Sequence, residues 1–156
     1  MKFGKVAGLV GAVLIAGAVG VTAIAWADNS SDPIKSRRDH MKSNGANAKI
    51  VGGFLDGSVA FDAAKAAEAT KAVATVGHEF GVEFDEYFPD SAKTGDTKAA
   101  PAIWEDKDGF KKRALALEAD ATAASAAAAN GADAFKAAAG KMFGNCKGCH
   151  KKFKLQ

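Results

Sequence analysis

The chain has few β-branched residues and little net charge, and both absences exclude classes of protein. Its main part is rich in alanine, a strong helix former, and no segment shows a convincing strand pattern. No repeat of 20–50 residues divides the 156 residues, a length that suits one domain with its own core. The formal net charge is only +3, whereas a nucleic-acid-binding domain would be strongly basic. We therefore predict one all-α domain that binds no nucleic acid.

The only long apolar run lies at the N-terminus. It covers residues 6–25, follows Lys2 and Lys5, and ends at Ala25-Trp26-Ala27, which has the small-x-small form of a signal-peptidase site. We predict a signal peptide over residues 1–27 and a mature domain over residues 28–156, whose net charge without the two leader lysines is +1. An uncleaved membrane anchor is the alternative, because about 20 apolar residues can span a bilayer. Either way, the domain is expected outside the cytoplasm.

Only two cysteines are present, and both lie in the segment Asn145-Cys146-Lys147-Gly148-Cys149-His150. The sequence Cys-x-x-Cys-His is typical of covalent haem c attachment. Residues three and four apart share a helix face, so Cys146 and Cys149 can add to the two vinyl groups of one porphyrin. His150 can then coordinate the iron as its proximal ligand. Thioether attachment of haem takes place in the bacterial periplasm, which agrees with the predicted export.

Three other interpretations of the cysteine pair compete with haem. A structural disulfide would close a tight loop and do little to hold a fold together. A thioredoxin-like redox pair is expected beside a strand–helix unit, and the flanking sequence contains no strand. A zinc site would need further ligands, and only His40 and His78 remain. Haem c is therefore the favoured cofactor.

Four helical segments are expected. The first begins at Asp32-Pro33, an N-cap followed by proline, and ends near Asp56-Gly57. The second covers about residues 58–80 and can be capped by Ser58 and Asp62. The third covers residues 101–129 and ends at Asn130-Gly131, and the fourth covers residues 132–154 and carries the cysteine motif in its last third. These segments predict an antiparallel, up-down-up-down four-helix bundle.

Apolar periodicity indicates which side of each helix faces the core. On the first helix a seven-residue repeat marks the inner seam: Ile34, Met41, Ala48 and Leu55. On the second the inner residues are Val59, Ala66, Val73, Val76 and Phe80. The third has its apolar bulk in Ile103, Trp104, Phe110, Leu115 and Leu117. Between these helices, residues 81–100 are expected to be irregular, with three aromatic side chains tucked beneath: Phe84, Tyr87 and Phe88.

The first helix also carries candidates for contact with the haem. Arg37 and Arg38 lie one turn before Met41, and a buried guanidinium needs an anion such as a haem propionate. Met41 can supply the second axial ligand through its thioether, or it can be ordinary core filler. An arginine at this position can also extend to the surface. His40 points about 100° away round the helix and is a weaker rival as ligand, and His78 is expected to be solvated at a helix end.

Five lysines surround the cysteine motif, and they have two interpretations. They are Lys141, Lys147, Lys151, Lys152 and Lys154. They can simply be a solvated face that is favourable near a helix C-terminus. Alternatively, they can form a weak docking patch for an acidic redox partner protein.

Together these features resemble the class II c-type cytochromes, that is, cytochrome c′ and the six-coordinate cytochrome c-556 group. The resemblance covers residues 30–154 and is most specific in two segments: residues 144–154, and the stretch from Phe88-Pro89-Asp90-Ser91 to Pro101-Ala102-Ile103-Trp104-Glu105. The family often has arginine where Lys154 stands here; lysine keeps the charge but lacks the planar, bidentate donor group of arginine. Many relatives pair through their first two helices, which leaves a homodimer open, although no exposed apolar patch is evident here.

The resemblance bears on the distal side of the haem. Cytochromes c′ usually place an apolar residue there and bind nitric oxide or carbon monoxide, whereas the c-556 type has a methionine. His40-Met41-Lys42-Ser43-Asn44-Gly45 resembles the c-556 pattern, with Arg37 at the arginine associated with the propionates. It implies a periplasmic electron carrier with His150 and Met41 as axial ligands. A gas-binding cytochrome c′ is the alternative, and an enzyme is disfavoured because no distal acid–base pair is evident beyond His40.

Overall fold

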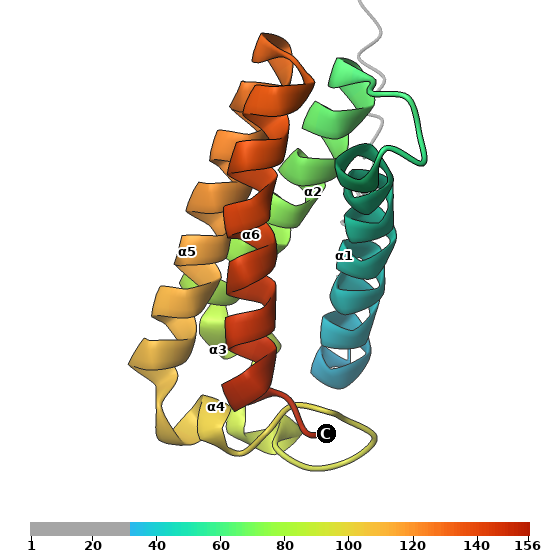
Figure 1. Ribbon diagram of the computed structural model, residues 1–156. Helices are drawn as coiled ribbons and strands as arrows, with labels where there is room; N and C mark the ends of the chain where they lie inside the picture. Colours follow the sequence, from blue (N-terminus) through green and yellow to red (C-terminus); the bar gives the residue numbers. More distant parts are fainter. Residues whose placement is uncertain (1–31) are drawn as a thin grey trace, which may run out of the picture.

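The computed structural model describes residues 32–156, which form an antiparallel bundle of four long helices (Figure 1). The predicted signal segment, residues 1–27, lies outside the described residues. Neighbours in the chain run in opposite directions, as the sequence predicts, and α2 packs most extensively on α5. The four long helices are α1 (Pro33–Asp56), α2 (Ala63–Val82), α5 (Lys107–Ala127) and α6 (Ala132–Phe153).

Both ends of α1 are where the sequence predicts them. The Asp32 side chain accepts a hydrogen bond from the Ile34 backbone N–H at 2.9 Å, and Pro33 occupies the first helical position. Gly57 ends the helix with φ of 79°, a left-handed conformation that glycine adopts without a steric penalty.

The predicted start of the second helix is wrong by five residues. The helix begins at Ala63, because Asp62 is its N-cap and accepts a hydrogen bond from the Lys65 N–H at 3.0 Å. Ser58 caps nothing; its backbone N–H instead donates to the Asp56 carboxylate at 2.9 Å, which stabilises the turn after α1.

The third predicted helix is interrupted. A short helix, α4 (Ala102–Glu105), ends at Asp106, whose non-helical backbone separates it from α5. The Asp106 side chain caps α5 by accepting a hydrogen bond from the Gly109 N–H at 3.0 Å. After α5, residues 128–130 form a 3₁₀ turn.

The stretch between α2 and α4 is mostly irregular, as predicted, but it contains a short helix, α3 (Phe84–Tyr87), and a 3₁₀ turn at Asp90–Ala92. Phe84, Tyr87 and Phe88 are buried beneath it, which confirms their predicted place. The end of this stretch pairs with the chain after α6: Ala100 N–H donates to Phe153 O at 3.0 Å, and Leu155 N–H donates to Lys98 O at 2.8 Å.

The buried side chains form two clusters, one towards each end of the bundle. One includes Val51 and Phe54 of α1, Val73 of α2, and Phe135 and Met142 of α6. The other gathers the aromatic residues near the end of α6: Phe80, Phe84, Tyr87, Phe88, Phe110 and Phe153. The middle of α1 contributes to neither cluster.

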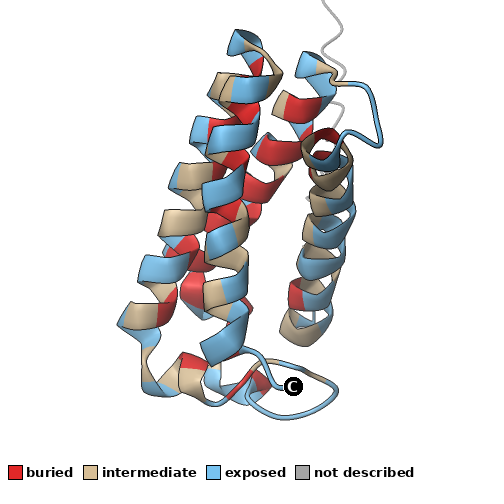
Figure 2. Ribbon diagram, viewed as in Figure 1, coloured by how far each residue is buried: buried red, intermediate tan, exposed pale blue. Residues whose placement is uncertain are grey.

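The predicted inner seam of α1 is therefore wrong in detail. Its buried residues are Arg37, Val51 and Phe54, and none of residues 38–50 is buried. Figure 2 shows this directly, since α1 is coloured as buried only near its two ends. A further predicted inner residue, Val59, is exposed because it precedes α2. Leu115 of α5 lies over Gly81 of α2 and is only partly covered.

Candidate functional site

The two cysteines lie on the inner side of α6, beside the aromatic cluster. Both thiols are free and half-buried, and Cys149 packs against the cluster that contains Phe110 and Phe153. Burial raises the pKa of Cys149 to about 11; the nearby Cys146 thiol also raises it, and Arg113 opposes the rise. Burial likewise raises the pKa of Cys146. The motif thus presents two neutral thiols on one helix face in apolar surroundings, as the three-residue spacing predicts.

Contacts of α6 with α5 determine where His150 lies. Asn145 donates to the Ala116 carbonyl oxygen at 3.4 Å and also bonds to the Asp120 carboxylate. A side chain at Gly148 would meet the Arg113 guanidinium at 3.4 Å. His150 follows Gly148 by two residues, about 200° round the helix, so it lies on the edge of α6 turned away from α5.

Figure 1 shows α1 on the side of α6 opposite to α5. His150 therefore lies on the edge that is turned towards α1. The residue is exposed; burial of its ring nevertheless lowers its pKa, and the charge of Lys154 lowers it further. A neutral imidazole is the form that can coordinate a metal.

Met41 lies in the middle part of α1, where none of the side chains is buried by protein. Its exposed fraction is 37%. Met41 follows Ile34 by seven residues, so the two side chains share one face of α1. Ile34 lies against Gly95. Gly95 belongs to the loop that pairs with the end of α6. Met41 is thus placed on the edge of α1 nearer α6.

Arg37 is buried, with 5% of its surface exposed, and it is directed at the loop after α3. Its guanidinium donates to Tyr87 O at 2.7 Å, Ala92 O at 3.0 Å and Thr97 Oγ1 at 3.3 Å. It also lies over the Phe88 ring at 5.0 Å. Burial lowers its pKa, and the charge of Asp32 opposes this. All these acceptors are neutral groups of the protein, so none of them balances the charge of Arg37. A contact between Arg37 and a haem propionate stays a prediction.

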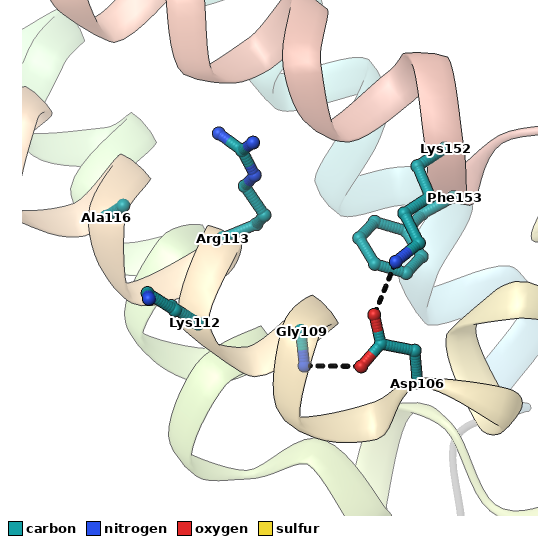
Figure 3. A pocket seen from close by; sticks show the side chains of 7 residues that line it. All are labelled: Asp106, Gly109, Lys112, Arg113, Ala116, Lys152 and Phe153. Carbon is teal, nitrogen blue, oxygen red and sulfur yellow. Dashed lines mark hydrogen bonds and ion pairs between the residues drawn. The ribbon is translucent and has the colours of Figure 1, made fainter.

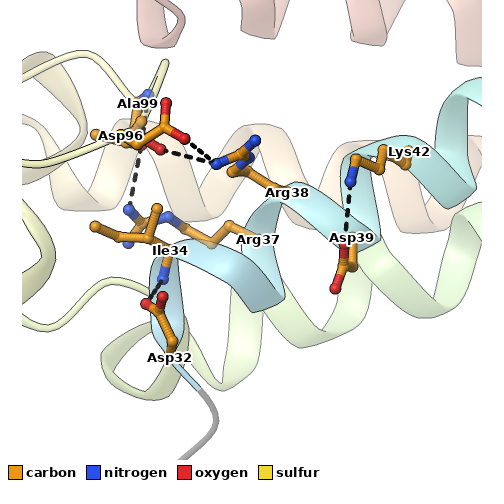
Figure 4. Close-up of polar contacts among 9 residues, drawn as sticks. Asp32, Ile34, Arg37, Arg38, Asp39, Lys42, Asp96 and Ala99 are labelled. Carbon is orange, nitrogen blue, oxygen red and sulfur yellow. Dashed lines mark hydrogen bonds and ion pairs between the residues drawn. The ribbon is translucent and has the colours of Figure 1, made fainter.

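Arg38, the neighbour of Arg37, lies at the surface and pairs with Asp96 (Figure 4). Figure 4 shows both arginines reaching from the first turns of α1 towards the same loop.

The two other histidines bridge pairs of helices. His40 Nε2 lies 2.7 Å from Glu79 Oε2, which turns its ring towards α2. His78 is exposed, as predicted, but it lies within α2 and pairs with Glu118 of α5 at 3.0 Å. Neither pairing could be found from sequence, because each joins helices whose register the sequence does not determine.

A hollow of about 390 Å³ opens between the first turns of α5 and the end of α6 (Figure 3). It does not contain the thiols, although Phe153 and Arg113 line it and Lys152 pairs with Asp106 at its rim. The basic side chains around it, Lys112, Arg113 and Lys152, continue the row of lysines on α6 that the sequence shows.

These residues fit a haem c. Two free thiols share one half-buried helix face, an imidazole follows on the edge facing α1, and the apolar surroundings of Cys149 suit a porphyrin. The middle of α1, which protein side chains cover only in part, lies on that same side of α6. Among residues 32–156, no cluster of three or more His, Cys, Asp or Glu side chains is arranged to hold a bare metal ion. The helices of this part of the chain are also too short or too polar to cross a membrane.

Comparison with known proteins agrees with this fold. The sequence profile of the family described as Cytochrome C′ matches residues 32–154. A cytochrome c′ of Rhodopseudomonas palustris is 36% identical over 143 residues, which cover 91% of this chain and 94% of that protein. A cytochrome c-556 of Agrobacterium tumefaciens is 32% identical over 123 residues, which cover 79% of this chain and 97% of that protein.

Solved structures give the same result. The structure of the Rhodopseudomonas palustris cytochrome c′ superimposes with a TM-score of 0.72 at 33% identity, over 81% of this chain and 98% of that one. A cytochrome c′ from Shewanella frigidimarina superimposes with a TM-score of 0.71 at 27% identity, over 83% of this chain and 98% of that one.

The fold and the attachment motif therefore define a haem protein of the four-helix-bundle class. The chain belongs to the cytochrome c′ family, which includes the cytochromes c-556 and whose members carry one covalently bound haem c. The predicted resemblance, the all-α bundle and the haem c cofactor are thereby confirmed.

Proposed function

We propose that this protein is a periplasmic carrier of single electrons. Its haem c would be attached through Cys146 and Cys149, with His150 as proximal and Met41 as distal iron ligand. The observation that carries the proposal is the arrangement of α1 and α6. The thiols and His150 lie on the inner side and the α1-facing edge of α6, and Met41 lies on the uncovered middle part of α1.

The bound haem would supply an iron that changes between Fe(II) and Fe(III), and thus accepts one electron at a time. The residues of the chain would do the rest. The two thiols hold the group in place, and the apolar cluster around Cys149 excludes water. His150 and Met41 together would leave no open position for a substrate, which fits a carrier and not an enzyme. Arg37 is proposed to interact with a propionate, through donor hydrogens that the loop does not use.

The lysines on α6 support a redox partner with an acidic surface. Within the described residues, Lys141, Lys147, Lys151 and Lys154 are exposed and form no ion pair, whereas several lysines elsewhere do, such as Lys35 with Asp39 and Lys65 with Asp62. Unpaired positive charge near the attachment motif would speed the approach of an acidic protein. Because surface charges are screened by salt, the rate of electron transfer to that partner should fall as ionic strength rises.

The second candidate function is a five-coordinate cytochrome c′ that binds nitric oxide or carbon monoxide at an open distal position. It is favoured by the exposure of Met41, 37% of whose surface is accessible, and by the relatives, some of which are named cytochrome c′. Either function is compatible with two further proposals. One is that residues 1–27 are a cleaved signal peptide, and the other is that the protein forms a homodimer through α1 and α2. N-terminal sequencing and analytical ultracentrifugation of the native protein test them.

The visible spectrum of the haem-loaded protein separates the two functions. With Met41 bound, the spectrum should be low-spin in both oxidation states and change little under carbon monoxide. Replacement Met41→Ala should produce a high-spin spectrum that does respond to carbon monoxide. Ile50→Ala is the matched control, since it removes another exposed apolar side chain of α1 and should leave the spectrum unchanged. A wild-type protein that takes up carbon monoxide readily contradicts the carrier and supports the gas-binding function.

A further inference from the structure

His40 connects the middle of α1 to α2. Its Nδ1 lies 2.7 Å from the Ser36 carbonyl oxygen, and its Nε2 lies 2.7 Å from Glu79 Oε2. The ring also packs edge-on against Tyr87 at 5.1 Å and lies 5.7 Å from Phe80. Both nitrogens face acceptors, so both contacts are attractive when both nitrogens carry protons.

Glu79 depends on this contact. About a quarter of its side chain is exposed, and its Oε2 atom is buried and accepts no well-directed hydrogen bond from any described residue. His40 Nε2, at 2.7 Å, is the polar atom that lies opposite this oxygen. Loss of His40 would leave the buried oxygen without this polar neighbour, which is costly.

The pair is the principal tie between the middle of α1 and the rest of the protein. Within the described chain, His40 makes the only hydrogen bond or ion pair from residues 39–50 to another element. None of these residues is fully buried, so protein packing holds this part of the helix less firmly than its two ends. A helix that is fixed at both ends and held by one bridge in the middle depends on that bridge for its local orientation.

We propose that the His40–Glu79 bridge is a positioning device that keeps Met41 turned towards the iron. This rests on the proposed ligation by Met41. Successive residues lie about 100° apart on a helix, so holding His40 on α2 directs Met41 to the other edge of the inner side, nearer α6. His40 thus acts through Met41 and touches no haem atom itself.

The bridge biases an equilibrium between a Met41-bound and an open distal position. We expect its loss to shift this ratio about tenfold towards the open state. A protein that is otherwise 99% Met-bound would then be open in about one molecule in ten, which is enough to detect. A bridge of this kind would distinguish a six-coordinate carrier from a gas-binding relative without any change in the ligands.

The test uses the haem-loaded protein with His40→Gln and, separately, Glu79→Gln, which removes the charge at nearly constant size. The rate of carbon monoxide uptake by the reduced protein should rise about tenfold in both variants, and the reduction potential should fall, because methionine ligation raises it. His78→Gln is the matched control: it breaks the His78–Glu118 pair between α2 and α5, which does not touch α1, and should change neither readout.

A double variant shows whether His40 acts through Met41. In a Met41→Ala background the distal position is already open, so His40→Gln should have no further effect on the uptake rate. An equal acceleration in both backgrounds overturns the proposal, and so does an uptake rate within twofold of the wild type in both single variants. Far-UV circular dichroism identifies a variant that fails to fold. If His40→Gln fails to fold, the carbon monoxide uptake rate of the Glu79→Gln protein decides.

The spectra and uptake rates of these variants distinguish failure of this proposal from failure of the proposed carrier function. If the wild type already takes up carbon monoxide fast and Met41→Ala changes nothing, Met41 is no ligand and both proposals fall. If the wild type is low-spin and Met41→Ala opens it while the bridge variants behave like the wild type, only the role of His40 falls.

Discussion

Arg37 shows how one residue can hold two parts of the molecule together. Its guanidinium reaches from the first turns of α1 to the carbonyl groups of Tyr87 and Ala92 and to the hydroxyl of Thr97. The loop that it joins also pairs with the chain after α6. Arg37 therefore fixes the end of the bundle next to the attachment motif, whether or not it also meets a propionate.

Replacement of Arg37 by methionine tests this role. The variant keeps the apolar stem over Phe88 but leaves two buried carbonyl groups without their donor, so we expect the free energy of unfolding to fall by about 3 kcal/mol. Arg38→Met is the control, because Arg38 is half exposed and pairs only with Asp96; its effect should stay within about 0.5 kcal/mol. Chemical denaturation of the haem-loaded proteins measures both values, and equal losses would show that Arg37 is not the structural link.

At the residue scale the sequence predicts chemistry better than contacts. The spacing of Cys146, Cys149 and His150 places them on one helix without further information, and in the structure the two thiols are half-buried. The partners of Arg37 and His40 lie about 40 to 60 positions away in the chain. Such contacts depend on how the helices pack, which local patterns do not contain.

At the scale of helices, α2 approaches the backbone of α5 closely at Gly77. A Cβ atom on Gly77 would lie 2.7 Å from the backbone nitrogen of Glu118 and 2.9 Å from the carbonyl oxygen of Ala114. Both are backbone atoms, so the two helices would have to separate to admit a methyl group. Absence of a side chain at this position is what permits their tight packing.

We therefore expect Gly77→Ala to lower the free energy of unfolding by about 1–3 kcal/mol, although alanine is the better helix former. Gly140→Ala is the matched control, since no atom lies within 4 Å of the new methyl group. That change should stabilise the protein by about 0.5–1 kcal/mol. Thermal unfolding followed by circular dichroism compares the two, and stabilisation by both substitutions would contradict the packing of α2 on α5.

Helix ends could be predicted where a single capping signal was present. Asp32-Pro33 and Gly57 determine both ends of α1. The start of α2 was wrong because Ser58 and Asp62 both have capping side chains, and only the packed structure decides in favour of Asp62. The break at Asp106 was missed although its signal is present: an aspartate three residues before Gly109 is a capping pattern inside a stretch with helical periodicity.

For the whole molecule, the four-helix order follows from four helical segments and their connections, and the comparisons and the structure agree on it. The error lies in α1, whose seven-residue apolar repeat predicts a seam against protein. In the structure the repeat of Ile34, Met41 and Ala48 is left half covered, and the protein core takes Arg37, Val51 and Phe54 instead. A pattern of apolar residues predicts an apolar partner, but it does not say whether that partner is protein or cofactor.

The proposal that Met41 binds the iron is the central one, and the nuclear magnetic resonance of methyl-labelled methionine tests it most directly. Of the three methionines, Met1 lies in the predicted signal peptide and Met142 is fully buried in the core away from the aromatic cluster, which makes it an internal reference. In the reduced, low-spin protein a methyl group bound over the porphyrin is shifted strongly upfield by the ring current. We predict one such resonance, absent in Met41→Ala, and methyl resonances that all lie in the ordinary range would contradict the account.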